Sequence, residues 1–218
     1  MSVAIAKPQG ATGNDSSRNN RALAILLTTV DDYDKYTGGH PDRVARYAGQ
    51  IARLLGLSYT TVDLVRRAAY VHDIGKILIP DSIVQKPGSL TDDEREVIKL
   101  HPELGARMLT RRSQTRDLAP VVLSHHERWD GQGYPHQLKG TEIPIESRII
   151  FVADAYDAMT TERPYGRVLS PQEARAELSR CSGHDFDPQV VRAMRLALSG
   201  QLLKRTRFEP KTPLSEAG

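Results

Sequence analysis

The sequence has 218 residues, which is enough for one domain of ordinary size with short tails. Lys and Arg total 30 against 27 Asp and Glu, so the net charge of +3 is too small to favour a nucleic-acid polymer as partner. The single cysteine, Cys181, excludes an intrachain disulfide and a thiolate metal cluster, and it fits a reducing cytoplasm. The sequence contains no run of about 18 apolar residues, so no membrane span is predicted.

The two ends of the chain differ in composition from the middle. Residues 1–20 are rich in Gly, Ser and Asn and predict a disordered segment, and residues 205–218 predict a flexible tail. The folded domain is therefore expected to span residues 21–204. An apolar stretch at 22–30 predicts a first helix that would be able to pack in a homodimer.

Helical periodicity dominates the middle of the chain. Apolar residues recur with the i, i+3, i+4, i+7 spacing of a helix face from Val44 to Leu55, and the same spacing recurs from Val65 to His72. The segment Ile77–Val84 is the exception. We expect it to be extended, because Pro80 interrupts any helix there.

Three later helices carry recognisable start signals. Thr91 with Glu94 forms a capping box that opens a helix predicted to run past His101. Ser170 begins a second box with proline at the first helical position, and Asp187 precedes a proline in the same way. Alternating strand patterns are scarce. The sequence therefore predicts an all-α fold, a compact helical bundle.

Several ionisable residues fall on the apolar faces of these helices. Five of the seven histidines do so, together with one aspartate inside the apolar run at 148–159. The set is His40, His72, His101, His125, His126 and Asp154. The other two histidines, His136 and His184, follow turn signals and are interpreted as loop residues.

The number of these inward-facing residues favours a metal site. A single inward histidine is usually a core residue bonded to a carbonyl, but buried polar groups are costly unless each is paired. One bundle interior rarely supplies six separate partners. A shared metal centre satisfies all of them, because imidazole nitrogens and carboxylates are both metal ligands.

A second signal is the run His72-Asp73-Ile74-Gly75-Lys76. Adjacent residues on a helix project about 100° apart, so His72 and Asp73 can both reach a metal pair beside the helix. Gly75 is expected to let the helix stop, which leaves Lys76 close to the site. Lys76 is either a solvated charge at a helix end or a group that binds phosphate and stabilises a leaving oxygen.

Four longer motifs resemble the HD-GYP family of the HD metal-dependent phosphohydrolase superfamily. They are HDIGK at 72–76, HPELG at 101–105, HHERWDGQGYP at 125–135 and ADAYDAMTTERPY at 153–165. The resemblance covers roughly residues 21–200. It implies an all-α bundle of the HD-domain type whose active members hydrolyse cyclic di-GMP to linear pGpG or onward to GMP.

The resemblance also implies a site. Two divalent metal ions, iron or manganese, would be held by His40, His72, Asp73, His101, His125, His126 and Asp154. Asp73 would bridge the metals, and a hydroxide between them would attack the phosphorus in line. Asp73 and Lys76 are thus the expected catalytic residues.

Substrate contacts are expected from Lys76, Tyr134, Arg163 and Arg167. Tyr134 lies in the glycine-rich turn that ends at Pro135, which the resemblance places at the pocket mouth and in contact with GGDEF-domain proteins. Purely structural stiffening would also explain this turn, because glycine and proline are the usual turn residues.

Two positions depart from the family pattern. Tyr36 stands where members with three metals have glutamate, which favours two metals and pGpG as the final product. Gly166 stands where a basic residue often follows, so Arg167 would have to replace it. These departures keep open a second interpretation, a catalytically weak cyclic di-GMP sensor or cyclase-docking module. A third interpretation keeps the chemistry but changes the substrate to another nucleotide or a hybrid cyclic dinucleotide.

Overall fold

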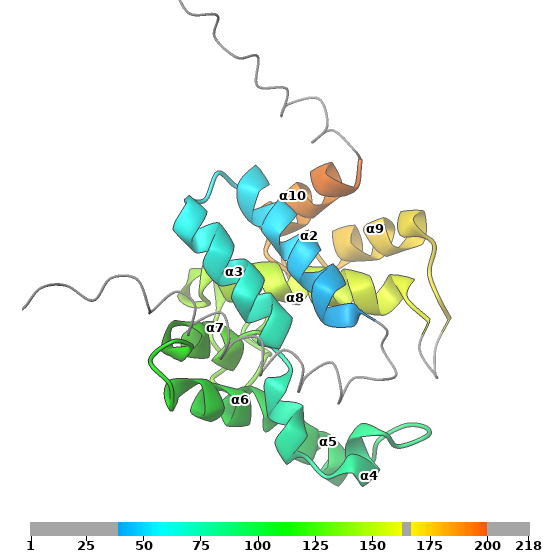
Figure 1. Cartoon of the computed structure of the whole chain (residues 1–218). Coiled ribbons are helices and arrows are strands. Elements are labelled where there is room, and N and C mark those ends of the chain that lie inside the picture. Colours follow the sequence, from blue (N-terminus) through cyan, green and yellow to red (C-terminus); the bar gives the residue numbers. More distant parts are fainter. Residues whose placement is uncertain (1–38, 163–166, 200–218) are drawn as a thin grey trace, which may run out of the picture.

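The computed structural model of the chain describes residues 39–162 and 167–199 (Figure 1). All regular elements in these two ranges are helices, which confirms the predicted all-α class. The predicted terminal segments at 1–20 and 205–218 and the predicted helix at 22–30 lie outside the described residues. So do three positions discussed above, Tyr36, Arg163 and Gly166.

The helices follow one another with short connections. In chain order they are α2 (His40–Leu54), α3 (Tyr59–Val71), the 3₁₀ helix η1 (Ile74–Leu78), α4 (Asp81–Val84), α5 (Asp92–Ile98), α6 (His101–Thr110), the 3₁₀ helix η2 (Arg116–Leu118), α7 (Ala119–Leu123), the 3₁₀ helix η3 (Gly140–Glu142), α8 (Ile145–Thr160), α9 (Pro171–Arg180) and α10 (Pro188–Leu198).

The hydrophobic core lies where α2 packs against α3, α8 and α10. In Figure 1, α8 runs behind α2 and α3. Val44 and Ile51 of α2, Val65 of α3 and Ile150 of α8 are completely buried there. These residues follow the helical periodicity of the sequence, so the expected apolar faces are the ones that the fold covers. Within the described residues, no helix combines the length and apolar character needed to cross a membrane.

A second group of helices is built around α6, which packs against η1 and α7. The short helices α4 and α5 extend from this end of the molecule (Figure 1) and contain no buried residue. The two groups meet where α3 contacts α7 and η2 and where α8 contacts α7. His72 and Asp73 of the sequence motifs lie on the segment that joins α3 to η1.

The helix opened at Thr91 does not run past His101, so that prediction was wrong. The capping box is present, but α5 ends at Ile98 and α6 begins at His101. The reason is Pro102, which has no N–H to donate to the carbonyl of Ile98, four residues earlier. The His101 Nδ1 donates to that carbonyl instead, at 2.7 Å.

The segment Ile77–Val84 is not extended as a whole, which is a second correction. Ile77 belongs to η1, and Val84 ends α4. Only Ile79 and Pro80 have extended backbone angles. Pro80 does break the helical run, but its fixed φ is also compatible with the position just before a new helix, and α4 starts there.

Gly75 does not end the preceding helix either. α3 already ends at Val71, and Gly75 lies within η1 without a positive φ. A Cβ atom at Gly75 would collide with the backbone carbonyl of His101 and with the amide of Gly105. The glycine is therefore required for the close approach of η1 to α6.

Candidate metal centre

The predicted ligands come together in two overlapping sets. Potential ligand atoms of Asp73, His101, His125 and His126 all lie within 4.8 Å of one another, and those of His40, His72 and Asp73 do the same. Asp73 belongs to both sets. The remaining predicted ligand, Asp154, has its Oδ1 3.5 Å from the Nε2 of His40. The tertiary structure thus gathers all seven residues.

Most of these side chains enter the site from helix ends. His40 and His101 are the first residues of α2 and α6, His72 follows α3 directly, and the His125-His126 pair follows α7. Asp154 lies inside α8, the helix that crosses behind α2 and α3 (Figure 1). A residue at a helix end is fixed by the helix on one side, while the chain is free to turn on the other.

Three of the histidines are held by the same hydrogen bond. His72, His101 and His125 each place Nδ1 2.6 to 2.7 Å from the backbone carbonyl three residues earlier. A carbonyl only accepts, so Nδ1 carries the proton in each ring. In the neutral imidazole, Nε2 then has a free lone pair that points into the site. Hydrogen bonds of this kind fix the tautomer and orientation of histidines that bind metals.

Unpaired polar atoms in the centre support a bound cation. The Nε2 atoms of His101 and His125 lie 3.2 Å apart, although both are acceptors in this tautomer. Two facing lone pairs repel unless a cation or proton lies between them. The Nε2 of His72 and the Oδ1 of Asp73 are buried without a hydrogen-bond partner among the described residues. The donor set therefore fits divalent metal ions.

Asp157 holds His40, and the sequence analysis missed it. His40 Nδ1 donates to its Oδ2 at 2.8 Å, and Arg43 donates to both carboxylate oxygens at 2.6 and 3.0 Å. Asp157 is 1% exposed and lies three residues after Asp154 on α8. The i, i+3 spacing of two aspartates on a mostly apolar helix is the sequence signal that could have indicated a buried role for Asp157. His40 is oriented by a carboxylate rather than by a carbonyl.

Burial keeps the central imidazoles neutral. It lowers the pKa of His125 well below its ordinary value, with a further contribution from His126. It lowers the pKa of His126 to about 3. Burial alone would raise the pKa of Asp73, but Lys76 and His72 hold it well below its ordinary value. Neutral imidazoles and an ionised carboxylate are the forms that bind metal.

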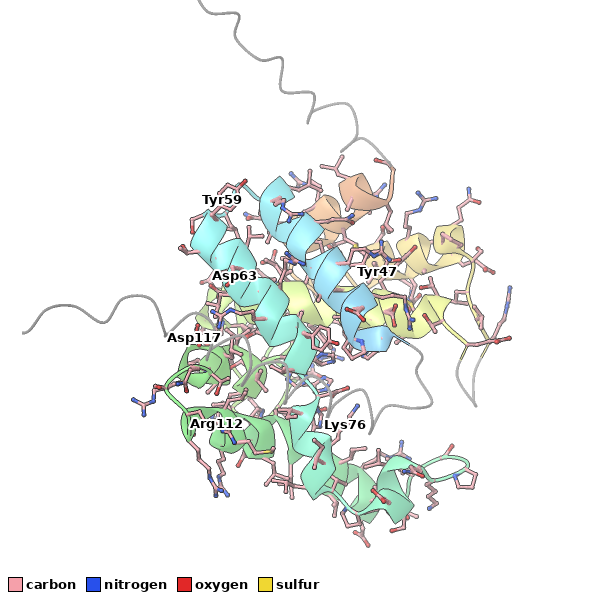
Figure 2. The ribbon with its side chains drawn as sticks, in the orientation of Figure 1. Tyr47, Tyr59, Asp63, Lys76, Arg112 and Asp117 are labelled. Carbon is pink, nitrogen blue, oxygen red and sulfur yellow. The ribbon has the colours of Figure 1, made fainter. Side chains whose placement is uncertain are left out.

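Lys76 lies at the centre, as predicted. Its Nζ is 2.6 Å from Asp73 Oδ2, and about a third of its side chain is exposed. In Figure 2, Lys76 lies at the junction between the α2–α3 side of the bundle and the α4–α5 end. The ammonium group is therefore beside the carboxylate that both sets share and is also accessible from solvent.

Tyr134 also lies against the centre. Its ring stacks on the imidazole of His126, with a centroid distance of 4.9 Å and an interplanar angle of 24°. Its N–H donates to the His126 carbonyl at 3.2 Å. Lys99 Nζ lies 6.0 Å from the centroid of the same ring. Tyr134, in the glycine-rich turn, thus borders the predicted metal ligands.

The other predicted residues have different surroundings. Arg167 is 78% exposed in its side chain and pairs with Glu173 at 2.6 Å. Arg163 lies outside the described residues. His136 and His184 are exposed, which confirms their assignment to loops. Besides Asp157, the sequence analysis missed Glu127, a buried carboxylate directly after the two histidines.

The fold and the centre define an all-α domain with a histidine and aspartate cluster at its helix ends. The profile of one family, described as HD domain, matches residues 8–190. Because this match covers most of the sequence, the chain belongs to the HD domain family. The match confirms the family resemblance of the four motifs.

Relatives of known assignment support the same placement. A protein of Thermotoga maritima named cyclic di-GMP phosphodiesterase is 45% identical over 196 residues, which cover 88% of this chain and 53% of that protein. A protein of Vibrio cholerae named 3′3′-cGAMP-specific phosphodiesterase 2 is 38% identical over 168 residues, 76% of this chain and 32% of that protein. The chain thus spans about half the length of the first relative and about a third of the second.

A solved structure shares the fold. Bd1817, an HDG"Y"P protein from Bdellovibrio bacteriovorus, superimposes with a TM-score of 0.63 at 21% identity. The similar region covers 84% of this chain and 59% of that one. At this level of identity the likeness concerns the fold alone, and it agrees with the helical bundle of the HD-domain type.

Proposed function

We propose that this chain is a metal-dependent phosphodiesterase that hydrolyses cyclic di-GMP to linear pGpG. The observation that carries the proposal is the pair of ligand sets that share Asp73. A carboxylate common to two sets is suited to bridge two cations, and paired cations are a recurring arrangement in phosphate-ester hydrolysis. The Nε2 lone pairs of three histidines point into the same space.

The proposed cofactors are two divalent ions, iron or manganese. Their proposed ligands are His40, His72, Asp73, His101, His125, His126 and Asp154. Nitrogen and oxygen donors without a thiolate suit either metal. Tyr36, in place of the glutamate of members with three metals, supports a count of two. When bound, such ions lower the pKa of a water and neutralise charge on phosphoryl oxygens.

The protein side chains supply orientation and charge. Asp73 fixes the two ligand sets relative to each other, and the Nδ1 hydrogen bonds keep the imidazoles aimed at the site. Lys76 is placed to contact a substrate phosphate and to stabilise the leaving oxygen. Tyr134 forms a wall beside His126. Arg163 and Arg167 are proposed to contact the substrate, which for Arg167 requires leaving its partner Glu173.

The substrate class is a cyclic dinucleotide. The Thermotoga maritima relative is named for cyclic di-GMP, and the Vibrio cholerae relative for 3′3′-cGAMP. We place cyclic di-GMP first because it is also the substrate implied by the motifs, and the hybrid dinucleotide second. A cytoplasmic location fits the single cysteine.

The test is metal analysis and product analysis on the same protein. Protein purified without oxygen should contain about two metal ions per chain. It should convert cyclic di-GMP to pGpG, as monitored by chromatography, and 3′3′-cGAMP is assayed in parallel. Asp73→Ala should lose both metal and activity. Metal-loaded protein that leaves both dinucleotides intact would refute the proposed activity.

The alternative function is a cyclic di-GMP sensor or a module that docks GGDEF-domain proteins. Gly166, in place of the basic residue common in the family, favours it because phosphate binding on that side is weakened. A sensor would bind cyclic di-GMP, or a GGDEF-domain protein, after metal removal and would release no product. Calorimetric titration of the metal-free protein separates this alternative from the enzyme.

A further inference from the structure

Glu127 is a buried acidic residue that the proposed metal chemistry does not use. It is 1% exposed and follows the His125-His126 pair directly. Within the described residues it has no cationic partner, and its recorded hydrogen bonds go to the backbone. A buried carboxylate is costly unless it is paired or hydrogen-bonded, so these backbone bonds must hold it.

The partners of Glu127 are in the turn that carries Tyr134. We call residues 131–138 the GYP loop. Oε1 of Glu127 accepts from the His136 N–H at 2.7 Å, and Oε2 accepts from the Leu138 N–H at 3.1 Å. The two bonds lie on either side of Gln137, which has a positive φ of 56°. The GYP loop therefore curls around one carboxylate, with one oxygen for each amide.

The same loop makes a second close contact with Glu127. A Cβ atom at Gly133 would collide with the backbone of Glu127 and Arg128, so only glycine permits this approach. The next residue, Tyr134, then places its ring on His126. The side chain of Glu127 bonds to the His136 and Leu138 amides, and its backbone packs against Gly133. Tyr134 lies between these two contacts in the chain.

We propose that Glu127 is a positioning residue that fixes Tyr134 against the proposed metal ligand His126. The proposal rests on the proposed function, because Tyr134 matters for turnover only if this face receives the substrate. Charge-assisted hydrogen bonds to backbone amides are strong, and two of them fix both distance and direction. The carboxylate of Glu127 itself bonds to the loop amides and not to a proposed metal ligand.

The first test uses Glu127→Gln, which keeps the shape but replaces one accepting oxygen by an NH₂ group that faces an amide donor. Amide hydrogen exchange at whichever of His136 and Leu138 faces the NH₂ group should accelerate at least about tenfold, because that amide loses its acceptor. Metal content should stay at the wild-type level, while kcat/KM falls by a similar factor. Glu142→Gln is the matched control, because Glu142 accepts from the Lys139 amide at 3.0 Å on the exposed surface.

The second test is a double substitution that separates positioning from a general loss of structure. If Glu127 acts through Tyr134, Glu127→Gln should have little further effect on kcat/KM once Tyr134→Ala is present. Additive losses would overturn the proposal. Loss of metal in Glu127→Gln would also overturn it, because the residue would then support the ligands rather than the tyrosine.

Amide hydrogen exchange in the wild-type protein tests the proposal even if the protein shows no turnover or the variants do not fold. In the wild-type protein, the His136 and Leu138 amides should exchange more slowly than the Gln132 amide, which is bonded to Asp130 on the exposed side of the loop. Equal exchange at all three amides would overturn the role of Glu127 even in an active enzyme. Slow exchange in a protein without activity would leave the anchor intact and refute only the proposed function.

Discussion

The orientation of His40 depends on one carboxylate. Asp157 accepts from His40 Nδ1 and from Arg43, and all three residues are at least partly buried. Burial lowers the pKa of His40, but Asp157 and Asp154 outweigh it and raise that pKa. A cation at Nε2 competes with the proton there. The metal binding of His40, a predicted ligand, therefore depends on these two carboxylates.

Asp157→Asn should weaken metal binding about 10- to 100-fold, the usual effect of removing a carboxylate that accepts a hydrogen bond from a metal-binding histidine. The amide keeps an acceptor for His40, but it loses the charge and brings an NH₂ group toward Arg43. Metal content after dialysis against graded chelator gives the affinity. Asp42→Asn, on the exposed side of the same helix end, is the control. Equal affinity in both variants would show that the bond to Asp157 does not support a ligand.

A titratable pair in the segment after His126 predicts a pH dependence of stability. Arg128 pairs with Asp130 at 2.7 Å and with Asp185 at 2.6 Å. The hydrogen bond from Arg128 lowers the pKa of Asp130 from 3.8 to about 2. A lowered pKa in the folded state gives stability that is fully present above pH 3.8 and is lost as the pH falls to about 2.

Asp130→Asn should therefore flatten the fall in unfolding free energy between pH 4 and about pH 2. Urea unfolding at several pH values in this interval measures it. The control is Asp92→Asn, because Asp92 is fully exposed in its side chain and its contact with Arg95 is long, at 3.5 Å. Parallel curves for wild type and Asp130→Asn would contradict the prediction.

At the scale of elements, the centre depends on how closely η1 approaches α6. Asp73 precedes η1 and His101 begins α6, and Asp73 Oδ1 lies 3.2 Å from His101 Nε2. Gly75 permits this distance because it has no side chain to meet the α6 backbone. Asp73 and His101 belong to the same set of potential ligands, so the separation of η1 and α6 also sets the distance between these two side chains.

Gly75→Ala should reduce the unfolding free energy by about 1 to 3 kcal/mol, the usual cost of overpacking, and should lower metal content by moving the two ligands apart. Denaturant unfolding and metal analysis measure the two effects. Gly49→Ala is a suitable control, because that buried helical glycine faces only the flexible side chain of Arg66. Normal metal content in Gly75→Ala would show that the helix contact does not set the ligand spacing.

At the scale of the whole molecule, the centre joins the two helix groups. α2 and α8 supply proposed ligands from the core side, while α6 and the segment after α7 supply proposed ligands from the other. A ligand that binds only the folded state stabilises it by mass action. Metal bound here would therefore stabilise the packing between the groups as well as the site itself.

Metal removal should lower the melting temperature of the protein. At a concentration 100 times Kd, one ion adds about 2.7 kcal/mol, which corresponds to about 5 to 10 °C for a chain of this size. Calorimetry with and without chelator measures the shift, and added manganese should restore it. In Asp73→Ala the chelator should change nothing. A chelator effect of equal size in this variant would place the stabilising metal elsewhere.

The sequence by itself determined the helical class and six of the converging residues, because helical periodicity shows which positions face inward and several inward polar residues need a shared partner. The seventh residue, Asp73, came from its motif. The predicted helix through His101 was wrong because Pro102 lacks an amide N–H. The predicted role of Gly75 as a helix end was wrong because its close neighbour, the α6 backbone, is distant in sequence. Asp157 and Glu127 were also decided only by the tertiary structure. Their partners lie 117 residues away for the His40 bond and 9 to 11 residues away for the amides of the GYP loop, and no local pattern specifies such contacts.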